Sequence, residues 1–189
     1  MFFFTPIKQT IVWLINKGIK MNYLKKFKGL GIKLPQKSSV QEILFVWIGS
    51  CIAIAIIGYL TKSYDNLLVM GSFGASCVLL FGFPNSPFSQ PRNVIFGHLF
   101  STLIGLLFLH FLGNDWLSMS LALATAIAVM FFTNTVHPPA GSNPLIVFLL
   151  NANFDYLIFP SFIGSIILII VALLFNNLHN KRTYPQYWF

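Results

Sequence analysis

The sequence contains very little charge and almost no acidic side chains. Of its 189 residues 8% are charged, with Asp and Glu numbering 4 against 12 Lys and Arg, whereas about a quarter of the residues of a soluble domain carry charge. Hydrophobic residues make up 56% of the chain. A composition so poor in charge excludes an ordinary soluble domain and indicates an integral membrane protein.

The residue combinations that catalysis and metal binding require are also missing. Asp65, Asp115 and Asp155 all lie in polar segments between apolar runs, so no pair of carboxylates converges on one place. Cys51 and Cys77 lie inside apolar runs and lack the spacing of metal ligands. We therefore expect no enzyme, no cofactor and no metal site.

Uncharged apolar runs divide the chain. At 1.5 Å per residue their lengths approach or match a hydrocarbon core of roughly 30 Å, so we expect an all-α polytopic membrane protein. Residues 1–39 form a basic amphipathic leader at the membrane surface, residues 40–180 the transmembrane domain, and residues 181–189 a cytoplasmic tail. The runs are Ile43–Leu60, Leu67–Phe83, Val94–Leu112, Leu117–Phe132 and Leu157–Phe175.

The basic residues predict the orientation of the chain. Most of them precede Glu42, and Lys181 and Arg182 follow the last run. Because Lys and Arg near a span favour the cytoplasmic side, both termini are expected there and the number of crossings is even. This placement favours contact with lipid over nucleic acid. The leader lacks the Arg- and Ser-rich pattern of a transit peptide, which favours a bacterial plasma membrane over the alternative, a plastid inner envelope.

A polar, proline-rich stretch from Thr133 to Pro144 separates two apolar runs. His137 and Pro138 each precede a proline, which disfavours the α region, so the helix that begins at Leu117 must end here. Asn143 is expected to be an extended N-cap, with Pro144 as the first residue of a new helix. Non-helical backbone at membrane depth is stable only when it is buried in protein or lines a wet cavity. This break is therefore either a packing feature or a binding site.

A second interruption is predicted at Gly71–Ser76, in the middle of the second run. Its small residues favour either close helix packing or a local unwinding. Each half of the chain then consists of a long span, an interrupted segment and a long span, which is a weak two-fold internal repeat. If the interrupted segments cross, there are six membrane segments; if they are re-entrant half-helices, there are four full spans.

The two interruptions together predict a small-anion site built from partial charges. A helix that begins after a break points its positive dipole end into it, and broken helices are common in transporters. His137 titrates near neutral pH and is the candidate for proton coupling or gating, followed by His98 and Arg92. The candidate substrate-binding residues are His137, Asn134, Thr135, Ser142, Asn143, Ser72, Ser76, Gly74 and Gly141.

Three ordered motifs resemble the HPP family of integral membrane proteins. They are Met70–Gly82, Ser89–Asn93 with Gly97-His98, and Val136–Gly141, within a resemblance that covers residues 21–189. The resemblance implies a transporter-like protein, and because plant and cyanobacterial relatives are implicated in nitrite transport, it makes nitrite the first substrate to consider. A channel for a small solute and a non-transporting membrane scaffold stay open as alternatives, and so does a homo-oligomer.

Overall fold

The computed structural model describes residues 23–64 and 68–188, and the regular secondary structure within them is helical. The chain divides into two units, Met1–Lys37 and Ser38–Phe189. In the first unit a short 3₁₀ helix, η1 (Tyr23–Lys28), precedes an exposed segment. The amphipathic helix predicted for the leader lies before residue 23 and outside the described residues.

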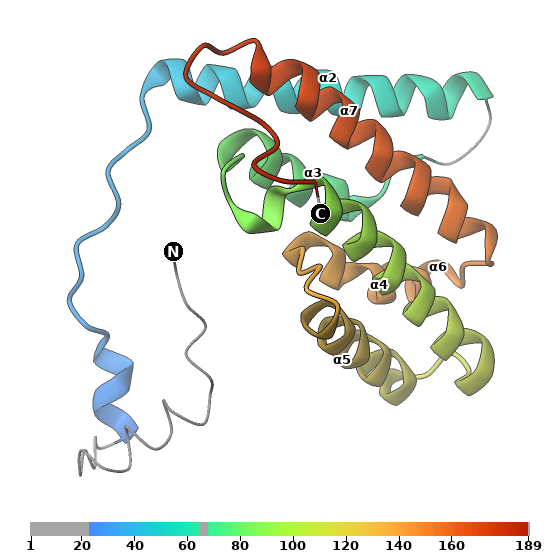
Figure 1. The fold of residues 1–189 in the computed structure, drawn as a ribbon. Coiled ribbons are helices and arrows are strands. Elements are labelled where there is room, and N and C mark those ends of the chain that lie inside the picture. Colours follow the sequence, from blue (N-terminus) through green and yellow to red (C-terminus); the bar gives the residue numbers. More distant parts are fainter. Residues whose placement is uncertain (1–22, 65–67, 189) are drawn as a thin grey trace. The chain divides into compact units, whose positions relative to one another are not determined.

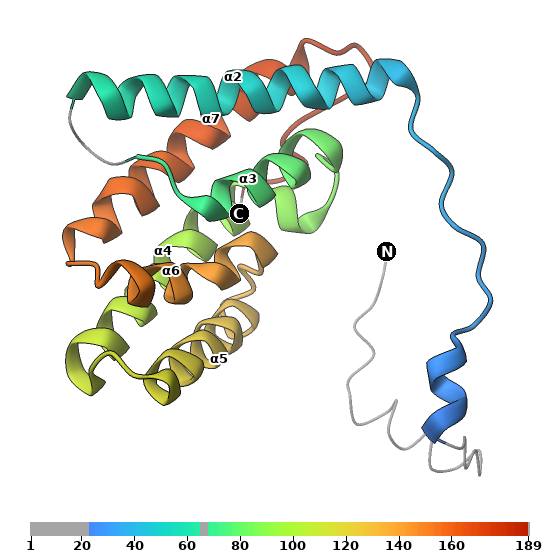
Figure 2. The ribbon, with the colours of Figure 1, turned by 180° about the vertical axis from the view of Figure 1, so that it is seen from behind.

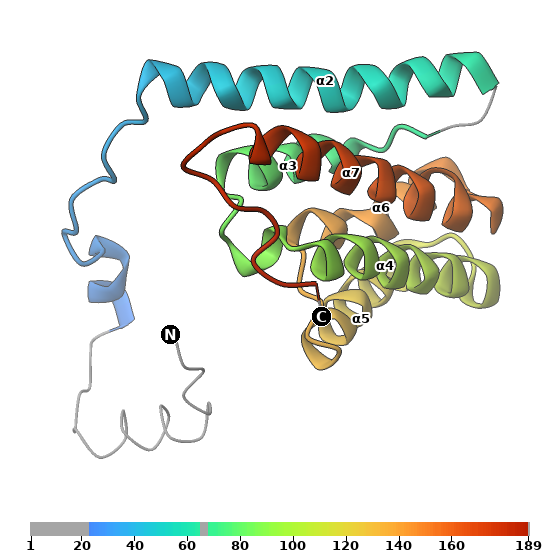
Figure 3. The same cartoon turned by 45° about the horizontal axis from the view of Figure 1, so that its top comes forward.

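Three long helices frame the second unit. They are α2 (Val40–Tyr64), α4 (Pro91–Leu112), and α7 (Ile163–Asn177) with the π-helical turn η5 (Leu157–Phe162) before it. Figure 3 shows α7 between α2 and α4. Among the described residues, the helices long and apolar enough to cross a membrane are Val40–Ser63, Pro91–Leu112 and Leu157–Asn177.

The remaining helices are shorter. The helix α3 (Gly71–Cys77) continues into the π-helix η2 (Val78–Gly82), and α5 (Trp116–Phe132) packs along α4. The 3₁₀ turn η4 (Pro138–Ser142) continues into α6 (Asn143–Leu150), which Figure 2 shows between α3 and α5. Because these helices are too short to identify as spans by length, the arrangement of six segments and the internal repeat stay predictions.

The start of α2, the end of η2, the start of α4 and the end of α7 lie together, and we call this the basic end. There Arg182 Nη1 donates to the Phe81 carbonyl at 2.6 Å. The ends of α4 and α6 lie together at the other side, the amide end, where Asn114 Nδ2 donates to the Phe148 carbonyl at 3.1 Å. Since α2 begins and α7 ends at the basic end (Figure 1), the helical unit starts and finishes on one side.

Of the two alternatives predicted for Gly71–Ser76, the local unwinding is wrong, because these residues form helix α3. The extended backbone lies before them, with Met70 at φ −124° and ψ 144°. The glycines lower helix propensity by only about 1 kcal/mol each. That cost is offset by packing, since Phe73 on the same helix is fully buried.

The break at His137 is present, although Asn143 does not have the predicted conformation. The helix α5 ends at Phe132, and His137 is extended with φ −133° and ψ 98°. Asn143, however, has helical angles, φ −60° and ψ −41°, and its N–H donates to the Ala140 carbonyl. The turn η4 thus runs directly into α6, so the extended N-cap predicted for Asn143 is wrong. The bonds of its side chain to α4 hold it there against the preference of a residue before proline.

Candidate functional site

Two glycines on α4 allow the break and α6 to approach this helix closely. A Cβ built on Gly97 would lie 2.8 Å from the Cβ of His137 and 3.1 Å from the carbonyl oxygen of Thr135. A Cβ on Gly105 would lie 2.9 Å from the Cα of Pro144. Both distances are too short for any side chain, so only glycine permits this packing at these positions.

Polar side chains on α4 donate to backbone carbonyls of the break. Within a membrane a carbonyl without a hydrogen bond costs several kcal/mol, so a non-helical segment needs such donors. The donors fix the break along the first half of α4. They are Arg92 Nη2 to the Thr133 carbonyl at 3.0 Å, Asn93 Nδ2 to the Val136 carbonyl at 3.0 Å, and Ser101 Oγ to the Ala140 carbonyl at 2.6 Å.

A single serine hydroxyl joins two buried histidines at the centre of this packing. Ser76 Oγ on α3 lies 2.8 Å from Nε2 of His137 and 3.1 Å from Nε2 of His98 on α4. The two imidazole rings are 5.0 Å apart between centroids. All three residues have no exposed surface. The break, α3 and α4 thus meet in one polar cluster, which we call the His–Ser–His cluster.

The partners of this cluster fix which nitrogen of His137 carries a proton. Its Nδ1 lies 2.7 Å from the carbonyl oxygen of Phe88, which can only accept, so Nδ1 donates. With neutral imidazole, Nε2 of His137 is therefore an acceptor. The hydroxyl of Ser76 then donates to it.

Asn143 fixes the tautomer of the other histidine. Its Nδ2 donates to the carbonyl of His98 at 3.3 Å and lies 3.0 Å from Nδ1 of the same residue, so that ring nitrogen accepts. Nε2 of His98 therefore carries the proton and donates to Ser76. The hydrogen bonds run in one direction, from Asn143 through His98 and Ser76 to His137 and Phe88.

A second layer of hydroxyls surrounds Asn143. Its Nδ2 also donates to Thr102 Oγ1 at 2.9 Å, and Thr102 Oγ1 lies 2.8 Å from Ser161 Oγ. Ser161 Oγ in turn donates to the carbonyl of His98 at 3.1 Å. Thr102 and Ser161 are both fully buried. The polar network therefore extends from the break to the turn η5 before α7.

The sequence comparisons identify the family. The family of the HPP transmembrane region matches residues 35–185. This chain belongs to the HPP transmembrane family. Two transmembrane proteins of Dictyostelium discoideum are each 35% identical to it, over 89% of this chain and over 58% and 64% of their own lengths. The chain thus spans only part of the curated relatives it matches. No solved structure shows a significant match.

In this chain the His-Pro-Pro tripeptide of the HPP family, residues 137–139, begins at the His–Ser–His cluster. His137 supplies the imidazole, and Pro138 and Pro139 begin the turn η4 that returns the backbone toward α4. Because Asn143 follows this turn, the same short segment delivers both a histidine and an amide to α4. The family motif therefore shapes the backbone of the break and also brings polar side chains to α4.

Two buried polar atoms in this HPP protein have no hydrogen-bond partner among the described residues. They are the hydroxyl oxygen of Ser72 and the side-chain carbonyl oxygen of Asn143. Ser72 lies one helical turn before Ser76 on α3, and its own carbonyl lies 3.1 Å from the Ser76 hydroxyl. An unpaired buried polar group costs about 1–3 kcal/mol, so each is a candidate contact for a ligand.

No described acidic side chain accompanies the histidines. Glu42 lies in the first turn of α2, Asp115 is the N-cap of α5, and Asp155 lies in the turn before η5. Asp65 is outside the described residues. Across residues 23–64 and 68–188 no group of three or more His, Cys, Asp or Glu side chains is placed to hold a metal ion.

The structure brings together some of the predicted site residues and separates others. His137, His98, Ser76 and Asn143 form the cluster, with Ser72 one turn away on α3. Asn134 and Gly74 are exposed, and no Cβ contact lies within 4 Å of Gly74 or Gly141. The Arg92 side chain donates to the Thr133 carbonyl, and the Thr135 hydroxyl bonds to the Thr133 hydroxyl. The Ser142 hydroxyl donates to the Pro139 carbonyl. All three bonds lie within or beside the break.

Sequence reasoning missed Thr102, Ser161 and the Phe88 carbonyl. Thr102 follows His98 by four residues, so it lies on the same face of α4. The small residues Gly97, Ser101 and Gly105 also recur at four-residue spacing, which is the pattern of a close helix contact in membranes. These periodicities could have identified the packed face of α4. No local signal indicates Ser161 or the Phe88 carbonyl.

Proposed function

We propose that this protein carries a small monovalent anion across the membrane together with a proton, with nitrite as the first candidate. The observation that supports it is the His–Ser–His cluster, buried without a described acidic side chain. A buried charge is costly unless it is paired. A proton on either imidazole is therefore stabilised by an anion beside it, and the anion is stabilised by the proton. Charge neutrality couples the two.

The hydrogen bonds of Ser76 suit such a proton change. With neutral histidines its hydroxyl donates to His137 and accepts from His98. When Nε2 of His137 gains a proton it becomes a donor, and the hydroxyl can turn to the Ser72 carbonyl, 3.1 Å away. Ser76 Oγ then accepts from both imidazoles. Every nitrogen in the cluster keeps a partner in both states, so proton gain requires only rotation of one hydroxyl.

The two unpaired atoms fit a ligand that arrives with a proton. The Ser72 hydroxyl can donate to an anion, whereas the Asn143 carbonyl oxygen can only accept. An anion by itself satisfies donors and leaves an acceptor unpaired. A small oxyanion that still carries its proton, before the proton passes to His137, supplies a donor as well. Nitrite is small enough to need few contacts, and the resemblance of the motifs makes it the first member of this class to test.

Burial favours a carrier over the alternative of a channel. His98, His137 and Ser76 have no exposed surface, whereas an open pore would expose its polar lining to water. The scaffold alternative gives the unpaired Ser72 hydroxyl no role. The membrane in which the protein works, a bacterial plasma membrane or a plastid inner envelope, stays a prediction.

The test is nitrite uptake into proteoliposomes with and without an inward proton gradient. We expect saturable, gradient-stimulated uptake by the wild type. His137→Asn and Ser76→Ala are expected to lose it, whereas Ser165→Ala, which removes another buried serine hydroxyl on α7, keeps it. Protein-free vesicles measure the passive passage of nitrous acid.

Competition defines the substrate class. Nitrate, formate and chloride are added outside vesicles that take up nitrite, and a small planar oxyanion is expected to compete better than chloride. Uptake no greater than in protein-free vesicles, for every anion and both gradients, would contradict the proposed function. Linear uptake that ignores the gradient would indicate a channel instead.

A further inference from the structure

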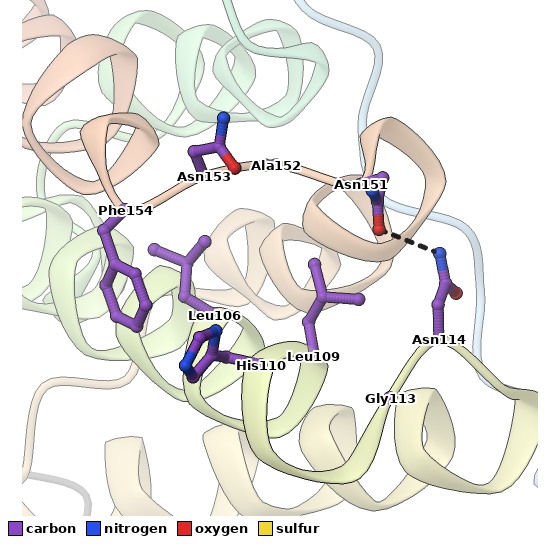
Figure 4. A pocket seen from close by; sticks show the side chains of 9 residues that line it. All are labelled: Leu106, Leu109, His110, Gly113, Asn114, Asn151, Ala152, Asn153 and Phe154. Carbon is purple, nitrogen blue, oxygen red and sulfur yellow. Dashed lines mark hydrogen bonds between the residues drawn. The ribbon is translucent and has the colours of Figure 1, made fainter.

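A polar cavity lies at the amide end, far along α4 from the His–Ser–His cluster. Its volume is about 360 Å³. Figure 4 shows side chains from the end of α4 facing those of the loop between α6 and η5 across it. Its lining contains no Lys, Arg, Asp or Glu. The residues are Leu106, Leu109, His110, Gly113, Asn114, Asn151, Ala152, Asn153 and Phe154.

One stripe of α4 connects this cavity with the cluster. His98, Thr102, Leu106 and His110 recur every four residues, so they form a stripe that winds slowly around α4 and rises about 6 Å at each step, at 1.5 Å per residue. His110 lines the cavity, and Thr102 belongs to the buried polar network through Asn143. Leu106, an apolar residue, lies between them along this stripe.

The burial of Leu106 places it at the boundary between cavity and network. It lines the cavity but has only 1% of its surface exposed, while Thr102, one turn further in, has none. Along the stripe, His110 therefore lies at an open polar cavity, Leu106 is apolar and buried, and Thr102 is polar and buried. An apolar constriction of this kind blocks ions because it offers them neither donors nor water.

We propose that this cavity is the vestibule through which the anion reaches the His–Ser–His cluster from the amide end, and that Leu106 is its gate. The site takes a small anion, because the amides of Asn151 and Asn153 and the imidazole of His110 offer donors and no carboxylate repels it. This inference rests on the proposed function. Movement of one leucine side chain joins the vestibule to Thr102 and the cluster.

Cysteine accessibility tests the gate without measuring transport. In full-length protein with Cys51→Ala and Cys77→Ala, single cysteines are placed at His110 and at Thr102 and exposed to a membrane-impermeant methanethiosulfonate in proteoliposomes. We expect His110→Cys to react from one side of the membrane only. Thr102→Cys is expected to stay unreactive until Leu106→Ala is added, which raises its reaction rate by about tenfold or more, because the apolar barrier is gone.

Leu109→Ala is the matched control, since Leu109 also lines the cavity but lies off the stripe. It is expected to leave Thr102→Cys unreactive. Ser161→Cys, on η5, repeats the measurement in case Thr102→Cys disturbs the network. Leu106 is not a gate if Thr102→Cys and Ser161→Cys are both labelled with Leu106 in place, or if neither is labelled after Leu106→Ala.

Transport measurements separate this inference from the proposed function. If nitrite is carried, Leu106→Ala is expected to admit it without a proton gradient, whereas Leu109→Ala stays gradient-dependent. If the cysteine pattern holds but no anion is taken up by the wild type, the proposed function fails and the gated vestibule stands. If uptake is proton-coupled but the cysteine pattern is absent, the anion takes another route and the gate fails.

Discussion

Ser76 is the residue on which the cluster depends, because its one hydroxyl has three polar neighbours. It contacts both imidazoles and the Ser72 carbonyl. Ser76→Ala leaves the Nε2 atoms of His98 and His137 without a partner. At about 1–3 kcal/mol for each unsatisfied buried group, the free energy of unfolding is expected to fall measurably. Denaturant unfolding in detergent, compared with Ser165→Ala, checks this prediction. Equal stability of the two variants would contradict the hydrogen-bonded cluster.

Ser72 gives the opposite expectation for stability. Its buried hydroxyl has no partner among the described residues, so Ser72→Ala removes an unpaired polar group and is expected to be neutral or stabilising by up to about 1–3 kcal/mol. If the hydroxyl donates to the anion, the same variant raises the KM for nitrite. Thermal unfolding and uptake kinetics on one preparation check both halves. A large loss of stability with an unchanged KM would show that this hydroxyl is structural.

At the scale of elements, α4 is the helix that organises the site. It packs on α5, α6, η4 and η5, and its side chains hold the break at several carbonyls. Gly97→Ala is expected to push His137 away, because its Cβ would lie 2.8 Å from that of His137. Overpacking of this kind costs typically about 1–3 kcal/mol. We expect a lower melting temperature and loss of nitrite uptake.

Gly74→Ala is the control for that experiment. Gly74 is also a helical glycine, but a Cβ there meets nothing within 4 Å. The substitution is expected to keep uptake and to stabilise α3 by up to about 1 kcal/mol through helix propensity. Loss of uptake in Gly74→Ala would restore this glycine to the site that the sequence predicted.

The C-terminal segment is an element that packs against the basic end. Tyr184 is 2% exposed, and its hydroxyl donates to the Ser89 carbonyl at 2.7 Å. Gln186 N–H donates to Gln90 Oε1 at 2.8 Å, next to the loop whose Phe88 carbonyl accepts from His137. The segment thereby supports the loop that orients His137. Whether residues 181–189 face the cytoplasm stays a prediction.

Tyr184 also sets a pH dependence at this end. Burial raises the pKa of its phenol above the ordinary value of about 10. Because the neutral form is favoured in the folded state, its stabilisation is complete below pH 10 and is lost as the pH rises through the folded pKa. Tyr184→Phe is expected to lower stability at pH 7 by about 1 kcal/mol and to flatten the alkaline loss. Unfolding measured from pH 7 to 11 checks this, and identical profiles would contradict it.

For the whole molecule, coupling through charge neutrality predicts electroneutral transport. An anion and a proton that move together carry no net charge, so the uptake rate depends on the pH gradient and not on the membrane potential. Potassium-free vesicles in a potassium buffer with valinomycin acquire an inside-positive potential, while the pH is held equal on both sides. Nitrite uptake that rises with an inside-positive potential would indicate that the anion moves alone.

The oligomer stays a prediction at this scale. Gly71, Gly74 and Ala75 on α3 and Val78 at the start of η2 are exposed, and small residues favour helix contacts in membranes. Lipid covers such a face equally well. The curated relatives extend beyond the region that this chain matches, so their full activities and partners are not those of this segment alone.

The sequence by itself determined the membrane class, the three long helices and the family, because composition and uninterrupted apolar length act locally. It also determined the break at His137, since two prolines remove backbone donors wherever they lie. The HPP motif and its order with Gly97-His98 placed His98 and His137, which meet at Ser76, among the candidates. Local chemistry was sufficient for each of these features.

Only the tertiary structure decided which polar residues form one site. For Gly71–Ser76 the sequence left open close helix packing and local unwinding, and the structure has a helix there. The sequence predicted an extended Asn143, which is helical because buried contacts outweigh the local conformational preference. It named Asn134 and Gly74 as candidates, and both are exposed and outside the His–Ser–His cluster, because polarity does not say which way a side chain faces. Ser76 is separated along the chain from His98 by 22 residues and from His137 by 61. Their meeting depends on the close approach that Gly97 permits, and no local pattern encodes that distance.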